Sequence, residues 1–174
     1  MKKVLLGLAM IVIGFLIYKL FIGGVGLEVG KTAPDFEANL QDGTPIKLSG
    51  YQGDYVLLDF WGSWCAPCRR ENPSLVKIYQ KFENKKTAKG EGFEIVSIAL
   101  EKIKKQAEGA IKRDNLYWPN HIISMRKIVL LSPLAQKYNV SSIPAKFLIN
   151  PEGKIISINP TIVEIEKTLD KYLQ

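Results

Sequence analysis

The feature that most constrains the fold is an apolar run that leads into the only two cysteines of the chain. Tyr55-Val-Leu-Leu-Asp-Phe-Trp61 is almost continuously apolar, which is typical of a strand covered on both faces. Cys65 and Cys68 follow, and apolar residues then recur at helical spacing between Leu75 and Phe82. Two thiols at this spacing, in the first turn of a helix, can form a short reversible disulfide. The pattern therefore indicates thiol–disulfide redox chemistry.

Other uses of the cysteine pair fit the sequence less well. A structural disulfide stabilises most when it closes a long loop, and Cys65-x-x-Cys68 closes a very short one. A zinc site needs four ligands, whereas the chain has two cysteines and a single histidine, His121, far away in sequence. Two unreactive core cysteines are the third alternative. We expect neither a metal nor another cofactor.

The chain before and after this motif alternates between strand and helix patterns. Short alternating runs on either side of Asp42-Gly43 favour a β-hairpin. A buried strand is predicted at 93–100, and a second helix is expected after it, marked by Ile103, Ala107, Ala110 and Ile111. A further strand is expected near 121–123, whereas 128–131 fits either a strand or a loop.

The C-terminal part has clear capping and turn signals. Ser132-Pro133 is an N-cap followed by proline, which predicts a short helix to about Tyr138. Asn150-Pro-Glu-Gly153 separates two strand-like runs, and Thr161-Ile-Val-Glu164 is a capping box before a last helix. The predicted fold class is α/β, with a central mixed β-sheet, helices on both faces and an added N-terminal β-hairpin.

The N-terminal segment is long and apolar enough to cross a membrane. Val4 to Leu27 exceeds the roughly 20 residues that a bilayer needs, with Lys19 the one charged residue inside it. Lys2 and Lys3 favour a cytoplasmic N-terminus, which would send the following domain across the membrane. The alternative is a cleaved signal peptide, with Gly23-Gly24-Val25-Gly26 small enough to be cut.

This division predicts two regions, 1–27 as a transmembrane anchor or signal segment and 28–174 as one folded domain. Part of the formal net charge of +7 lies in the N-terminal segment, and the other lysines scatter without forming a stripe. A solvated surface is therefore a better interpretation of the charge than nucleic-acid binding.

The ordered set of motifs resembles the thioredoxin-fold family and, within it, the membrane-anchored TlpA/ResA-like thiol–disulfide oxidoreductases. The resemblance runs from about Gly30 to the C-terminus. Its marks are Ala33-Pro-Asp-Phe36, Asp42-Gly43, Asp59-Phe-Trp-Gly-Ser-Trp-Cys-Ala-Pro-Cys-Arg-Arg-Glu-Asn-Pro73, Ile143-Pro144 and Phe147-Leu-Ile-Asn-Pro-Glu-Gly153.

The resemblance implies roles for four catalytic residues. Cys65, partly exposed at the helix N-terminus, would be the attacking nucleophile, because free N–H groups and the helix dipole favour its thiolate. Cys68 would resolve the mixed disulfide. Asp59, buried in the strand, would have a raised pKa and help to move protons at Cys68. Glu71, one turn after Cys68, would tune the pKa values of the cysteines.

Substrate contact is implied for residues on either side of the cysteines. Ile143-Pro144 resembles the cis-proline loop of the family, which exposes the backbone before the proline to an extended substrate. The family usually has threonine after this proline, where this chain has Ala145. Trp64 is expected on the docking surface, and Ala66 and Pro67 within the motif complete the substrate-binding set.

As a whole, the resemblance implies a reductase of the bacterial inner membrane with its redox domain on the periplasmic side. Its expected substrates are disulfides of exported proteins, with apocytochrome c as one example, and its expected electron donor is a membrane protein of the thiol-reductase type. We expect a monomer that binds no nucleic acid.

The alternatives are a disulfide-forming oxidant of the same fold and a non-catalytic thioredoxin-fold binding module. A peroxiredoxin-type peroxidase fits less well, because its Pro-x-x-x-Thr/Ser-x-x-Cys setting is missing.

Overall fold

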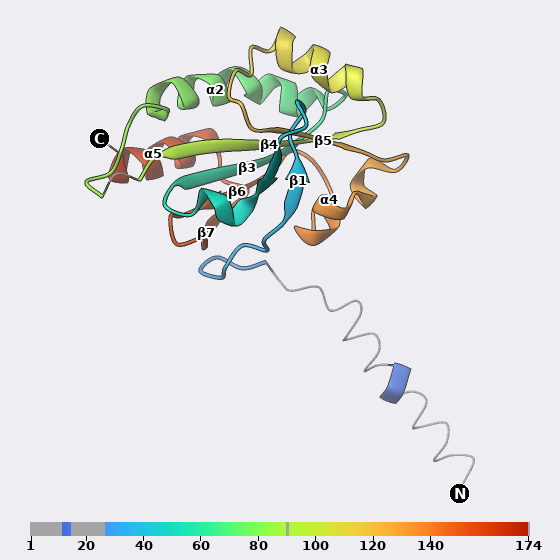
Figure 1. Cartoon of the computed structure of the whole chain (residues 1–174), viewed down its shortest axis with the longest axis horizontal. Helices are drawn as coiled ribbons and strands as arrows, with labels where there is room; N and C mark the ends of the chain where they lie inside the picture. The colour runs from blue at the N-terminus through green and yellow to red at the C-terminus, as the bar shows by residue number, and fades with distance from the viewer. Residues whose placement is uncertain (1–11, 15–26, 90, 174) are drawn as a thin grey trace, which may run out of the picture.

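A computed structural model describes residues 12–14, 27–89 and 91–173 of the chain (Figure 1). Its centre is a five-stranded mixed sheet in the order β5-β4-β3-β6-β7. The strands are β3 (Tyr55–Trp61), β4 (Phe93–Glu101), β5 (His121–Met125), β6 (Ala145–Ile149) and β7 (Ile155–Ile158). β3 runs parallel to β4, and β4 to β5, while β6 pairs antiparallel with both β3 and β7. The predicted fold class is confirmed.

Strand β3 occupies the middle of the sheet because it is apolar on both faces. All seven of its residues are buried. Side chains alternate along a strand, so Tyr55, Leu57 and Trp61 belong to one core cluster, and Val56, Leu58 and Phe60 belong to the other. Asp59 therefore points to the same face of the sheet as Leu57 and Trp61.

Helices cover both faces of the sheet (Figure 1). α2 (Ala66–Phe82), α3 (Lys104–Arg113) and α5 (Ile162–Tyr172) contribute to the core cluster that contains the cysteines. The short helix α4 (Pro133–Lys137) contributes to the opposite cluster, together with residues from the N-terminal hairpin region. The helix that starts at the cysteines thus packs on the face toward which Asp59 points.

The predicted turns and caps are present. β1 (Glu37–Asn39) pairs antiparallel with β2 (Pro45–Lys47), and Gly43 in the turn has a φ of +94° that favours glycine. Ser132 caps α4 by accepting the N–H of Ala135, and Thr161 forms the expected capping box with Glu164.

Two details differ from expectation. Ile103, expected within the second helix, is instead the N-cap of α3, which begins one residue later, and it is 54% exposed. The ambiguous 128–131 region contains neither strand nor plain loop but a short 3-10 helix, Val129–Leu131. A second 3-10 helix, Leu48–Tyr51, follows the N-terminal hairpin.

The predicted anchor or signal segment lies, apart from residues 12–14 and 27, outside the described residues. Within the described ranges, no helix combines the length and the apolar character that a membrane crossing requires. The proposed boundary at residue 27 stays a prediction.

Candidate active site

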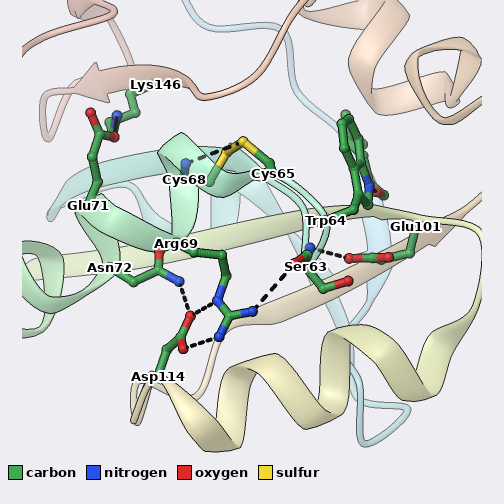
Figure 2. The surroundings of a disulfide bond; sticks show 11 residues. Ser63, Trp64, Cys65, Cys68, Arg69, Glu71, Asn72, Glu101, Asp114 and Lys146 are labelled. Carbon is green, nitrogen blue, oxygen red and sulfur yellow. Dashed lines mark hydrogen bonds and ion pairs between the residues drawn. A yellow bond between two sulfur atoms is a disulfide. The ribbon is translucent and has the colours of Figure 1, made fainter.

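The two cysteines lie at the N-terminus of α2 and are joined in a disulfide (Figure 2). Cys65 is the N-cap of the helix, and its Sγ accepts the N–H of Cys68 at 3.3 Å. Pro67 stands in the first turn, where a missing N–H leaves no helical hydrogen bond unmade. A sulfur at this position faces the positive end of the helix dipole, which favours a thiolate when the disulfide is reduced.

The exposure of Cys65 corrects the expectation from the sequence. A partly exposed residue is predicted, but in the disulfide form Cys65 is 4% exposed and Cys68 is 2% exposed. The neighbouring residues Trp64, Ala66 and Pro67 are exposed.

The loop before the cysteines is held by the end of β4. Trp64 is 53% exposed, yet its indole N–H donates to the backbone oxygen of Leu100 at 2.9 Å. The N–H of Ser63 donates to the carboxylate of Glu101 at 2.5 Å, and Glu101 is fully buried (Figure 2). Sequence reasoning missed Glu101, whose one signal was an acid at the end of an apolar strand. The exposed indole is thus presented in a fixed orientation.

A second group of polar contacts joins the start of α2 to the end of α3. The Arg69 guanidinium donates to both carboxylate oxygens of Asp114, which is the C-cap of α3. The buried amide of Asn72 donates to the same carboxylate at 2.6 Å. Figure 2 shows this cluster below the cysteines, between the two helices. The sequence contains no local pattern that pairs these residues.

Asp59 is buried under α2, as predicted. It is 2% exposed, and burial raises its pKa to about 7, an effect that nearby Lys146 opposes and nearby Glu71 adds to. A carboxyl group with a pKa in this range exchanges protons readily at neutral pH.

Glu71 and Lys146 form an ion pair on the β6 side of the cysteines. The Lys146 ammonium lies 2.5 Å from the Glu71 carboxylate, with side-chain exposures of 6% and 38%. Lys146 is the register partner of Asp59 on the neighbouring strand. The sequence prediction included Asp59 and Glu71 but not the lysine between them.

The peptide bond between Ile143 and Pro144 is cis, as predicted. Both residues are half-buried, and Ile143 packs against the core cluster that contains both cysteines. β6 begins directly after this bond, at Ala145. The substrate-binding role of this pair stays a prediction.

Nothing in the described ranges suggests a metal centre. No group of three or more His, Cys, Asp or Glu side chains there could hold an ion. His121 is 2% exposed in β5, and its Nε2 lies 3.0 Å from the backbone oxygen of Leu116. It is a core residue on a strand away from the cysteines.

Comparison with known proteins places this site in a family. The model of the AhpC/TSA family matches residues 29–158, which is most of the chain and includes every residue of the candidate site. The chain belongs to the AhpC/TSA family.

Named relatives narrow the assignment. The chain is 33% identical over 147 residues to "Thiol-disulfide oxidoreductase ResA" of Bacillus subtilis (strain 168), covering 84% of this chain and 75% of the relative. It is also 33% identical over 174 residues to the protein of the same name from Geobacillus kaustophilus, covering 98% and 93% of the two chains.

Solved structures agree with these relatives. The thioredoxin domain of a thiol-disulfide oxidoreductase from Bacteroides vulgatus superposes with a TM-score of 0.70 at 29% identity, covering 86% of this chain and all of that one. With Cys65 and Cys68 bonded at the helix N-terminus, this AhpC/TSA family member is a thiol–disulfide oxidoreductase with a thioredoxin-like fold.

Proposed function

We propose that this oxidoreductase reduces disulfides of exported proteins on the outer side of the bacterial inner membrane. The apolar segment within 1–27 would anchor it, with Lys2 and Lys3 keeping the N-terminus in the cytoplasm. Apocytochrome c is one expected substrate, and a membrane thiol reductase is the expected electron donor. The protein would act as a monomer without nucleic acid.

The reaction begins with the reduced pair. The Cys65 thiolate attacks one sulfur of a substrate disulfide, forming a mixed disulfide and expelling the other substrate sulfur as a thiolate. Cys68 then loses its proton and attacks the Sγ of Cys65, which releases the second substrate sulfur. The substrate has gained two electrons, and the enzyme holds the Cys65–Cys68 disulfide until the donor reduces it.

The surrounding residues divide the remaining tasks. Asp59 would accept the proton of Cys68, because a buried carboxyl group with a pKa of about 7 is ionised in part of its population at neutral pH. Glu71 would tune the ionisation of the site from α2. Trp64, Ala66 and Pro67 would contact the substrate from the loop side, and Ile143 and Pro144 from the strand side.

The observation that supports this function most directly is the position of Cys65 as the N-cap of α2. The deciding measurement is the reduction potential of the Cys65–Cys68 couple in the full-length chain, equilibrated against glutathione or dithiothreitol. We expect a value near that of thioredoxin, about −270 mV, which favours reduction of substrates. A value near −120 mV, typical of a strong oxidant, would reverse the proposed direction.

Two simpler measurements test whether the protein is a catalyst and where in the cell it lies. Catalysis of insulin reduction by dithiothreitol is expected, and its absence would favour a non-catalytic binding module. Fractionated cells should hold the protein in the membrane fraction, and recovery from the cytosol would contradict the proposed location.

A further inference from the structure

Lys146 is a buried lysine close to the redox helix. It is 5% exposed, although an ammonium group loses much of its hydration energy when it is buried. Such a group is stable only when nearby negative charge or hydrogen bonds compensate. Its surroundings therefore show which charges the fold has brought to the site.

The sheet register places Lys146 against Asp59. The two are paired residues on the antiparallel strands β6 and β3. Leu148 of β6 and Leu57 of β3 belong to the core cluster on the α2 side, and alternation along each strand puts Lys146 and Asp59 on that same face. Both side chains thus lie on the face of the sheet that α2 covers.

Helix α2, which packs on this face of the sheet, adds the carboxylate of Glu71. The Lys146 ammonium lies 2.5 Å from the Glu71 carboxylate, so this lysine joins the strand that follows the cis-proline to the helix that carries the cysteines. Figure 2 shows the pair on the side of Cys68 away from Ser63 and Glu101.

The titratable and charged groups around Asp59 come from two elements. α2, which begins at the cysteines, contributes Glu71, and β6 contributes Lys146. On the β4 side, the register partner of Asp59 is Ser97, whose hydroxyl accepts the indole N–H of Trp118 and carries no charge. Among the described residues packed at this point, Lys146 is the cation that faces Asp59.

We propose that Lys146 is a positioning residue of the redox reaction, whose buried positive charge balances Glu71 and Asp59 beneath the resolving cysteine. This inference rests on the proposed role of Asp59 as proton acceptor for Cys68. With Lys146 and Glu71 both charged, their charges cancel, so ionised Asp59 adds a single net negative charge. Without the ammonium, ionised Asp59 would lie near the partly exposed carboxylate of Glu71 without the positive charge that now compensates it.

The two partners of the ion pair should therefore shift the titration of Asp59 in opposite directions. Lys146→Met removes the positive charge, so the pKa of Asp59 should rise, by about one pH unit or more. Glu71→Gln removes a negative charge, so the pKa of Asp59 should fall. A merely structural bridge would lose the same contact in both variants and would not predict opposite signs.

The test follows the Asp59 carboxyl carbon by NMR across pH in the reduced, full-length protein, kept in mild detergent. Asp59→Asn assigns the signal by removing it. Lys77→Met is the matched control, because it removes an exposed lysine from α2 and should leave the titration unchanged. The pH at which insulin reduction is half-maximal should move with the carboxyl titration in each variant.

Opposite shifts in Lys146→Met and Glu71→Gln support the inference. No shift in either variant, or shifts of the same sign, would overturn it. Should Lys146→Met fail to fold, Lys146→Gln keeps a donor toward Glu71 without the charge, and the same upward shift is expected. The titration of Asp59 is measured independently of the reduction potential. An oxidising potential would therefore refute the proposal that the protein reduces its substrates, but it would leave the inference about Lys146 unchanged.

Discussion

The two sides of the cysteine pair differ in residue type and in burial. On the loop side, Trp64 is 53% exposed and is held by a hydrogen bond to the end of β4. On the other side, Asp59 of β3 and Lys146 of β6 are almost fully buried, and Lys146 forms an ion pair with Glu71. Both sides flank the same short disulfide.

The difference matches the two tasks of a thiol–disulfide exchange. A large aromatic surface in a fixed orientation can contact a partner protein at little cost in conformational entropy. Proton transfer instead needs groups whose ionisation is shifted by burial and by neighbouring charges. The structure thus separates a face suited to contact from an interior suited to proton handling, and mutations on each side should have different signatures.

The largest effect should come from the cysteines that both sides serve. Cys65→Ser is expected to abolish insulin reduction, because the attacking thiolate is lost. Cys68→Ser keeps that thiolate but cannot resolve the mixed disulfide, so it should accumulate a covalent adduct with the substrate, visible on a non-reducing gel. Retained turnover in Cys65→Ser would remove the assignment of the nucleophile.

The next largest effect should come from the buried side, as a pH-dependent change in stability. Burial raises the pKa of Asp59 from 3.8 to about 7, so the folded state holds this proton more tightly than the unfolded state. The stabilisation that comes from this tighter proton binding is fully present below about pH 4. It is lost as the pH rises through about 7, where Asp59 ionises in the folded state. Asp59→Asn cannot ionise, so its free energy of unfolding should not fall in this pH range. Above pH 7 the variant should be more stable than wild type by up to about 4 kcal/mol, because each unit of pKa shift corresponds to ~1.4 kcal/mol.

Urea unfolding of the full-length chain at pH 4 and pH 8 measures this difference. Glu152→Gln is the control, since it removes a carboxylate from an exposed turn between β6 and β7. A stability difference between Asp59→Asn and wild type that stays constant over this pH range would contradict the buried, proton-binding carboxyl group.

The smallest effect should come from the loop side. Glu101→Ala removes the acceptor of the Ser63 N–H and should lower the free energy of unfolding by about 1 to 3 kcal/mol. Glu101→Gln keeps a carbonyl acceptor and should lose less. Because Glu101 holds the loop before the cysteines, Glu101→Ala should also raise the KM for insulin more than it lowers kcat. An unchanged KM would show that the loop orientation does not matter for contact.

Local sequence patterns were sufficient for much of the fold and part of the site. The apolar run of β3, the capping box at Thr161 and the Asp42-Gly43 turn are short-range signals, and each produced the expected element. The redox motif likewise consists of neighbouring residues in the chain, so its placement at a helix N-terminus followed from the sequence. The cis bond before Pro144 followed from the resemblance.

Contacts between distant segments were the part that the sequence did not reveal. Lys146 meets Glu71 across 75 positions, Glu101 meets Ser63 across 38, and Asp114 meets Arg69 across 45. In the linear chain, nothing indicates which distant partner each of these residues contacts. Ile103 also differs from expectation, because an apolar residue at helical spacing proved to be an exposed N-cap.

By itself, the sequence determined the strand, the helix and the two thiols between them, because hydrophobic periodicity and turn chemistry act over a few residues. The tertiary structure alone decided which charges surround those thiols. Sheet register brought Lys146 opposite Asp59, and helix packing brought Glu71 onto Lys146. Electrostatic interactions depend on distance in space and on burial, and neither quantity exists until the chain has folded.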